Sequence, residues 1–203
     1  MIHKPGDRPP VYPEIRQAPD CFAIADQWLR PPGLDFQAGT SGTVDQAAGR
    51  LWVIPFTNRL PLRVKALGTY TPTDGALGTF IRCLIYEMTP AGHPGRVRAQ
   101  TDDIDQGSSV GSKSESLMVE LEPRTWGLGV VTSTGNPATI TGLDKNDLRR
   151  LGTTAINDSA ADCHFRYSVT YTGAGEDLSY PESPALRTQD PPLVAVRAEI
   201  INR

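Results

Sequence analysis

Apolar and polar residues alternate with a period of two along most of the chain from Gly49 onward. The segment 62–66 alternates Leu, Val and Ala with Arg and Lys, and the segment 163–171 places five apolar or aromatic residues opposite four polar ones. Such alternation is typical of β-strands with one buried face. The segment 79–88 is apolar on both parities, which indicates a strand that is covered on both faces.

Turn-forming sequences separate these strand segments. They read PTDG, TPAGHPG, DQGSSVGS, STGNP and GAGED, and each combines Gly or Pro with small polar residues. Short strands at this spacing are typical of an antiparallel sandwich and not of alternating β–α units. We therefore predict an all-β protein with a jelly-roll-like antiparallel β-sandwich over residues 48–203. A short helical insertion is expected within 143–152, where Asp144 can cap it and Gly152 can end it.

The most apolar run of the chain, GRLWVIPF at 49–56, contains a proline near its end. Proline cannot donate a backbone hydrogen bond and occurs in strands mainly at edges, first positions and bulges. We interpret this run as the first strand of the sandwich, with Pro55 at a point where strand pairing stops.

The first 47 residues have a different character, and we predict an N-terminal arm there. Residues 1–20 contain five prolines, which favours an extended conformation. The next segment, PDCFAIADQWLRPPG, has helical spacing, and Pro31 and Pro32 would end a short helix of about residues 19–30. A helix of this length needs a docking surface. Its expected docking residues are Phe22, Ala25, Trp28 and Leu29.

Composition and charge exclude several classes of protein. The 203 residues carry a formal net charge of -3, which argues against a nucleic-acid-binding protein because such proteins need clustered positive charge. No apolar run approaches 20 residues, so we expect no membrane insertion. The N-terminal sequence lacks the apolar stretch of a secretory signal. The three cysteines are far apart and fit neither a zinc motif nor a disulfide framework, so we expect free, mostly buried thiols.

Candidate catalytic chemistry is sparse. The three histidines are isolated, and His164 is expected on the solvent face of its strand. The acidic segment 102–105 lacks the full order of a calcium loop. The glutamates on strands include no pair with a spacing that selects it for glycoside hydrolysis. We therefore predict no catalytic residue, no metal site and no cofactor, and hold that the protein is not an enzyme.

Aromatic residues near strand ends provide candidate binding positions. Sugar rings stack on flat aromatic faces and form hydrogen bonds with neighbouring polar groups. Tyr70, Tyr171 and Tyr180 are the candidate ligand-binding residues, because each lies near Thr, Asp or Glu side chains at a strand end or in a loop. The alternative is that they cover the ends of the sandwich. Trp52 and Trp126 lie within strong strand patterns and are assigned to the core.

The order of several short motifs resembles a β-sandwich domain found in bacteriophage tail, fibre and spike proteins. The motifs are AGRLWVIPF, GTFIRCLIYE, PAGHPGR, LEPRTWGLGVV, GNPATITGL and PPLVAVRAE, and they cover roughly residues 48–200. The chain departs from the family pattern at Arg124, where the family often has glycine, and it is longer over 144–190. The matching positions are Gly49, Arg50, Leu51, Pro55, Phe56, Ile85, Tyr86, Pro94, Gly95, Leu121, Pro123, Trp126, Leu128 and Arg197.

This resemblance implies a structural virion component, such as a tail fibre, head spike or similar appendage, assembled in the bacterial cytoplasm. Residues 1–33 would attach it to other virion proteins, and the family analogy implies a homo-oligomer, usually a trimer. The sandwich would then bind host surface polysaccharide. Two alternatives stay open: an architectural or decoration protein without a ligand, and, more distantly, an enzyme that acts on polysaccharide.

Overall fold

The computed structural model describes residues 26–33, 37–107, 109–133, 139–148, 164–171, 178, 185–187 and 190–201. In this part of the chain, no helix is long and apolar enough to cross a membrane. The elements are β1 (Gln27–Leu29), β2 (Thr40–Val44), β3 (Arg50–Asn58), β4 (Leu62–Thr71), β5 (Phe80–Met88), β6 (Pro94–Gln100), β7 (Ile104–Asp105), β8 (Gly111–Leu121), β9 (Arg124–Thr132), β10 (Ile140–Leu143), a one-turn 3-10 helix (Lys145–Asp147), β11 (His164–Ser168), β12 (Ala185–Arg187) and β13 (Ala195–Ile200).

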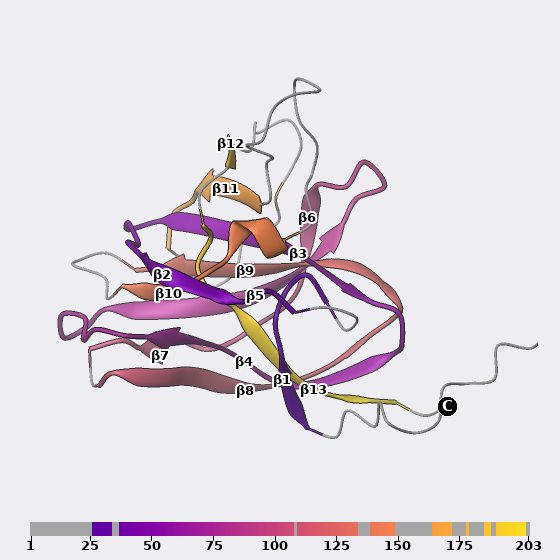
Figure 1. The fold of residues 1–203 in the computed structure, drawn as a ribbon, viewed down its shortest axis with the longest axis horizontal. Coiled ribbons are helices and arrows are strands. Elements are labelled where there is room, and N and C mark those ends of the chain that lie inside the picture. Colours follow the sequence, from indigo (N-terminus) through magenta and orange to yellow (C-terminus); the bar gives the residue numbers. More distant parts are fainter. Residues whose placement is uncertain are drawn as a thin grey trace, which may run out of the picture.

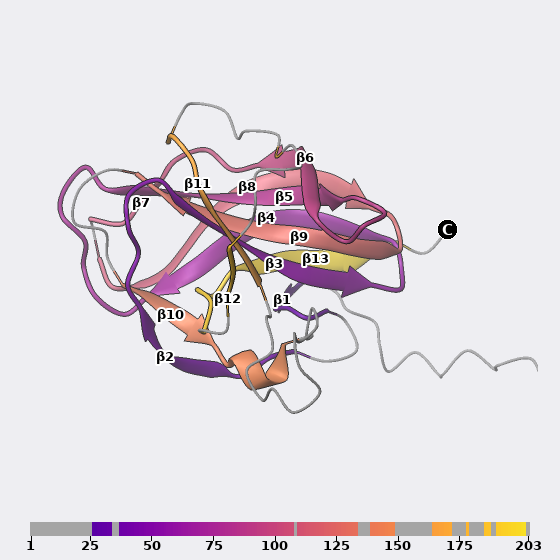
Figure 2. The same cartoon turned by 90° about the horizontal axis from the view of Figure 1, so that it is seen from above.

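The strands form two large antiparallel sheets that pack face to face (Figure 1). One sheet has four strands in the order β1-β13-β4-β8. The other has seven strands, with β12-β11-β3-β9-β5-β6 in sequence and β7 paired to β5. A two-stranded sheet of β2 and β10 lies to one side of them (Figure 2). The architecture confirms the expected all-β antiparallel sandwich.

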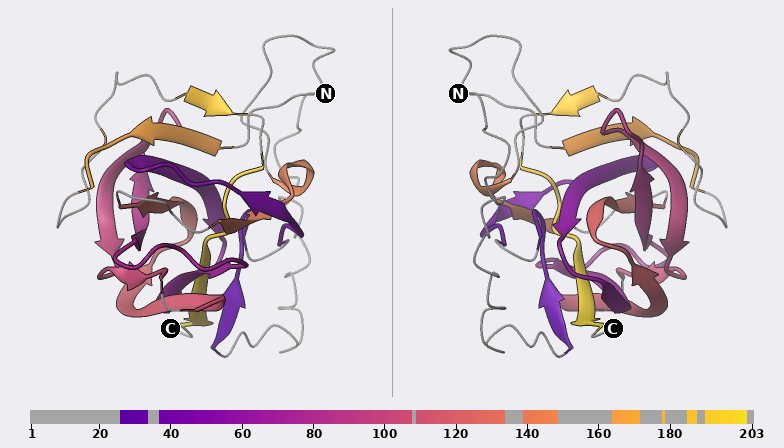
Figure 3. Two further views of the ribbon diagram at one scale, coloured as in Figure 1. Left: turned by 90° about the vertical axis from the view of Figure 1, so that its left-hand side faces the viewer. Right: turned by 90° about the vertical axis from the view of Figure 1, so that its right-hand side faces the viewer.

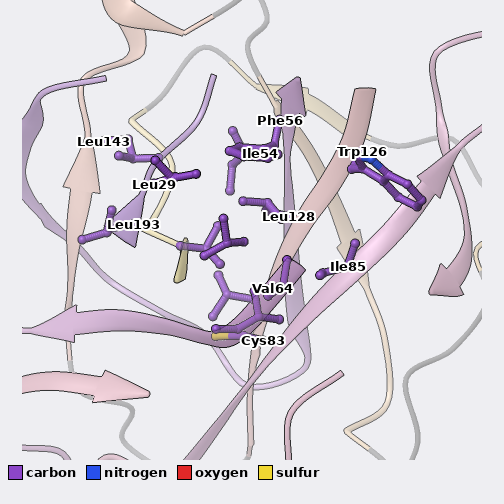
Figure 4. Packing of buried hydrophobic residues seen from close by; sticks show 14 of the residues in the cluster. Leu29, Ile54, Phe56, Val64, Cys83, Ile85, Trp126, Leu128, Leu143 and Leu193 are labelled. Atoms are coloured by element: carbon purple, nitrogen blue, oxygen red, sulfur yellow. The ribbon is translucent and has the colours of Figure 1, made fainter. Parts of the chain in front are cut away.

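The main hydrophobic core lies between the two large sheets. Strands β3, β5 and β9 of the larger sheet each contribute alternate apolar side chains to it, and β4, β13 and β8 contribute those of the facing sheet (Figure 4). Trp52 and Trp126 are both buried here, as expected from the sequence. Cys83 is a buried free thiol in the same cluster, and burial raises its pKa to about 12.

A second apolar cluster covers the opposite face of the larger sheet. It includes Tyr86 from β5 together with Phe165 and Tyr167 from β11. The sheet curls, so that β11 approaches the turn between β5 and β6 (Figure 3). There the His93 and Phe165 rings meet edge to face with their centroids 5.7 Å apart. Strand β5 is thus covered on both faces, which confirms the interpretation of its sequence pattern.

Pro55 lies where β3 loses one of its two neighbours. Strand β11 pairs only with Arg50–Val53, whereas β9 pairs with β3 along its length. The Thr57 N–H points away from β9 and donates a 2.8 Å hydrogen bond to the carbonyl oxygen of Pro32. Because backbone N–H groups alternate sides along a strand, the Pro55 nitrogen also faces away from β9. Pro55 therefore removes no hydrogen bond between β3 and β9. The prediction that strand pairing stops near Pro55 is confirmed on the side of β3 that faces β11.

The prediction of a helix at about residues 19–30 is wrong for residues 26–30, the part that the structure describes. Residues 27–29 form β1, which pairs antiparallel with Ala198–Val196 of β13. The free edge of β13 satisfies the backbone groups of this segment, and Asp26, with a φ of 58°, precedes the strand in a conformation that an α-helix does not contain. Phe22, Ala25 and the rest of the expected arm helix lie outside the described residues. Within 1–47, β1 joins the four-stranded sheet of the sandwich, and β2 pairs with β10 in the two-stranded sheet.

The helical insertion and the position of His164 also differ from what the sequence predicts. The helical insertion expected within 143–152 is a single 3-10 turn over its described residues. His164 was expected on a solvent face, but its side chain is fully buried and its ring lies 5.0 Å from the Trp52 ring. The reason is that other residues cover both faces of β11. The polar residues at alternate positions of its sequence therefore do not indicate a solvent-exposed face.

We expect the substitution Phe56→Ala to lower the free energy of unfolding by about 3–5 kcal/mol, because Phe56 is fully buried and its loss leaves a cavity in the main core. The matched control is Leu77→Ala, since Leu77 is 90% exposed and should change stability by less than about 0.5 kcal/mol. Urea unfolding monitored by tryptophan fluorescence would measure both. Equal effects of the two substitutions would contradict the assignment of the core.

Candidate binding groove

The outer face of the four-stranded sheet carries small side chains between two exposed aromatic rings. The register places Ala195, Gly68 and Ser114 in one row across β13, β4 and β8. Tyr70 lies two residues beyond Gly68 on the same face, and Trp28 of β1 lies one row away in the other direction, opposite Arg197. Trp28 and Tyr70 are 42% and 41% exposed, which is unusual for such large side chains in this protein.

These rows form a shallow groove of about 190 Å³. The small residues make its floor, Trp28 and Tyr70 its two aromatic sides, and polar groups lie at its ends. This volume is below the ~300–1,000 Å³ that is usual for pockets of drug-sized ligands, so the groove is too small to enclose a molecule of that size. The lining residues are Trp28, Arg30, Gly68, Thr69, Tyr70, Ser112, Lys113, Ser114, Leu193 and Ala195.

Gly68 is required for the groove to have this shape. A Cβ atom at this position would lie 2.6 Å from the carbonyl oxygen of Lys113 and 3.1 Å from Cη2 of Trp28. The first distance shows how closely the β8 backbone approaches, and the second shows that the indole ring extends over Gly68. Glycine within a strand often marks such a close approach. Here it lets the indole lie along the sheet.

A network of ion pairs holds β1, and hence Trp28, against the sheet. Asp26, directly before β1, accepts a 2.5 Å hydrogen bond from Arg197 of β13 and lies 3.8 Å from the Lys65 Nζ of β4. Lys65 also pairs with Glu199 of β13 at 2.7 Å. Arg63 extends the network by pairing with Glu199 and with Glu120 of β8, each at 3.2 Å. The network thus connects all four strands on the face that carries the groove.

The charges in this network stabilise one another's ionised forms. The hydrogen bond from Lys65, followed by that from Arg63, holds the pKa of Glu199 below its ordinary value of 4.5. The hydrogen bond to Glu120 raises the pKa of Arg63. The Asp26 carboxylate lies beside two cationic side chains, those of Arg197 and Lys65. The acidic groups close to Trp28 are therefore already paired with cations.

The structure places the predicted binding residues in different parts of the molecule. Tyr70 lines the groove, whereas Tyr180 lies outside the described residues. Trp28, expected as a docking residue, also lines the groove, and its neighbour Leu29 is buried in the main core. Phe22 and Ala25 belong to the part of the chain that is not described. Of the predicted residues, only Trp28 and Tyr70 come together among those described.

Tyr171 has its own set of contacts on the other sheet. Its hydroxyl donates a 2.7 Å hydrogen bond to Asp103, and the guanidinium of Arg82 lies 4.8 Å from its ring centroid. Arg82 and Asp103 form a close ion pair, with the Arg82 side chain almost fully buried. Burial, followed by the hydrogen bond to Asp103, raises the pKa of Tyr171. These contacts connect the segment after β11 to that after β6, so Tyr171 has a role in holding the curled sheet.

The acidic residues considered for metal binding have other partners in the described part of the chain. No group of three or more His, Cys, Asp or Glu side chains there is arranged to hold a metal ion. In the acidic segment, Asp103 is engaged by Arg82 and Tyr171, and Asp105 accepts a 2.8 Å hydrogen bond from the Gly107 N–H. Two other surface hollows, at 47–50 with 168–170 and at 61, 120–123 and 201, are lined by no aromatic residue.

Comparison of the chain with protein-family models, with curated proteins and with solved structures found no match. The groove is therefore interpreted from its own geometry and chemistry.

Sequence reasoning missed Arg30, Gly68, Ala195 and the serines of β8 as groove residues. A signal for part of this set is present in the segment ALGTY at 66–70. On a strand, its alternate positions place two small residues and a tyrosine on one face. Arg30 and Trp28 could not be assigned to this face while their segment was expected to be helical.

The ion-pair network predicts a pH dependence of stability. Because the pKa of Glu199 is lowered in the folded state, its contribution is present above pH 4.5 and is lost as the pH falls through the folded-state pKa. We therefore expect Glu199→Gln to have a lower melting temperature than the wild type at pH 7, and the difference to shrink as the pH falls below about 4.

The control for this experiment is Glu122→Gln, since the exposed Glu122 side chain makes no ion pair within the described residues. Differential scanning calorimetry at low ionic strength would give the melting temperatures. A difference between wild type and Glu199→Gln that stays constant from pH 7 to pH 3 would contradict the proposed network.

Proposed function

We propose that this protein is a non-enzymatic saccharide-binding protein whose ligand occupies the groove between Trp28 and Tyr70. The observation that carries the proposal is the pair of exposed aromatic side chains on either side of a floor of small residues. A pyranose ring has apolar C–H faces and a rim of hydroxyl groups. It therefore needs flat aromatic surface and polar groups side by side, and aromatic side chains with a polar handle supply both.

The polar groups of the groove match this requirement. Ser112 and Ser114 of β8 lie in the same rows as Tyr70 and Gly68, and each hydroxyl can donate and accept a hydrogen bond. Arg30 and the Tyr70 hydroxyl add further donors. The aromatic rings supply binding energy, and the hydroxyl groups and the guanidinium fix the orientation of the sugar. This division of roles is usual in small-molecule sites.

We further propose that the protein acts as a subunit of a phage or phage-like particle, where it would present this groove to host surface polysaccharide. Support comes from the order of sequence motifs that resembles the sandwich domain of phage tail, fibre and spike proteins. A sandwich with an aromatic-lined groove on its outer face suits adhesion. In this proposal the N-terminal residues attach the subunit to other virion proteins, and the copies assemble as a homo-oligomer.

We expect Trp28→Ala and Tyr70→Ala each to weaken saccharide binding by about tenfold or more, because truncating a central aromatic contact commonly costs ~2 kcal/mol. The control is Tyr171→Phe, which changes an aromatic residue on the other sheet and should leave the affinity unchanged. A glycan array would identify a ligand, and isothermal titration calorimetry would compare the variants. No binding to any glycan on the array or to host cells would contradict the saccharide proposal and favour the architectural alternative.

The attachment role predicts separate effects for two N-terminal deletions. Removing residues 1–25 should abolish incorporation into particles while leaving a cooperatively folded sandwich. Removing residues 1–33 should also lower stability, because it deletes Leu29 from the core and the Pro32 carbonyl that accepts the Thr57 N–H. Particle incorporation is measured by immunoblotting of purified particles, and stability by thermal unfolding. Normal incorporation of the 1–25 deletion would contradict the attachment role.

A further inference from the structure

We infer that the groove selects a carboxylate-bearing sugar, such as a uronic acid residue, over its neutral counterpart; this inference rests on the proposed saccharide function. Arg30 is the lining residue whose charged side chain lies on the groove's face of the sheet, and none of the lining residues is acidic. The protein as a whole has a formal net charge of -3, whereas Arg30 gives this groove a positive group.

Arg30 is in position to meet the anionic group. It follows β1 directly, and since Leu29 lies opposite Val196 with its side chain in the core, Arg30 is on the outer face at the level of Ala195. Ala195 lies opposite Gly68, and Gly68 opposite Ser114. Arg30 therefore stands at one end of the row that forms the groove floor, with Ser114 at the other. A sugar ring stacked on the indole above this floor has the guanidinium at one edge and a hydroxyl group at the opposite edge.

The Arg30 guanidinium makes no ion pair with any carboxylate of the described residues, in contrast to the neighbouring Arg197. Only its backbone N–H is engaged, by the Gln37 Oε1 at 3.2 Å. The nearby Asp26 is bound by Arg197 and Lys65. Glu115 of β8 lies opposite Leu67, whose side chain is in the core, and so belongs to the other face of the sheet.

The two aromatic residues and Arg30 together define the chemical class of the ligand. The rings require a flat partner with apolar faces, which a pyranose provides. The guanidinium offers a planar fork of donors that binds a carboxylate with two parallel hydrogen bonds. Lys113 does not add to this charge, because it lies opposite the buried Thr69 and its side chain belongs to the other face of the sheet. A pyranose with a carboxylate at its edge satisfies all of these groups at once.

The experiment compares a tetrasaccharide that contains glucuronic acid with the same tetrasaccharide after reduction of its carboxyl groups to alcohols. Binding to the full-length protein is measured by isothermal titration calorimetry at low and at high salt. We expect the acidic tetrasaccharide to bind at least tenfold more tightly at low salt, with a smaller difference at high salt. Arg30→Gln should remove most of this difference, because it weakens binding of the acidic form more than binding of the neutral form.

Two further variants keep the result interpretable. Arg30→Lys keeps the positive charge but loses the planar fork, and should retain an intermediate preference for the acidic form. Arg96→Gln removes an exposed arginine of β6, on the other sheet, and should bind as the wild type does. Thermal unfolding checks that each variant is folded.

Each outcome decides between the two proposals. Equal binding of the acidic and neutral tetrasaccharides, or a preference that Arg30→Gln leaves unchanged, would overturn the inference about the carboxylate while leaving saccharide binding in place. Binding of neither tetrasaccharide, together with no binding on a glycan array, would overturn the saccharide function itself.

Discussion

Burial of the β3–β9–β5 layer on both of its faces is the constraint on which the rest of the structure depends. One face packs against the four-stranded sheet, and the other is covered by the curled edges of its own sheet. The curl requires room on the outer face of β9, where Gly129 provides it: a Cβ there would lie 3.0 Å from the Tyr86 ring. Tyr86 fills this space and brings the second cluster together. Without this packing, the apolar residues on the outer parity of β3 and β5 would face solvent.

Where one face of a strand is solvated, the sequence pattern was sufficient to predict the structure. Strand β4 alternates as expected up to Val64, with apolar residues in the core and Arg63 on the outer face. Where both faces of a strand are covered, the alternation of apolar and polar residues does not indicate which side chains are exposed. His164 shows this, because its polar character marked it as external, whereas β3 and its Trp52 ring cover it. Such burial depends on how far the sheet curls, which is a long-range property that a local pattern does not encode.

The segment 27–29 shows a second limit of the sequence pattern. Apolar residues at 22, 25, 28 and 29 fit a helical face, and three residues are too few to show a period of two. The segment forms a strand because the edge of β13 offers hydrogen-bond partners to the backbone of a strand and none to a helix. In the strand, Trp28 and Leu29 point to opposite faces. One side chain therefore enters the groove while the next enters the core, and the groove could not be assembled from the sequence without this pairing.

The same alternation separates the residues of the groove from those that stabilise the fold. Along β13 and β4, Val196 and Leu67 enter the core, while Ala195 and Gly68 form the groove floor. Changes at Trp28, Arg30 or Tyr70 therefore alter the surface that a ligand meets without opening a cavity between the sheets. Gly68 is the exception, because the β8 backbone restricts it as closely as the indole does. The aromatic sides and the charged end of the groove can thus change without loss of core packing, whereas the width of its floor is fixed by strand packing.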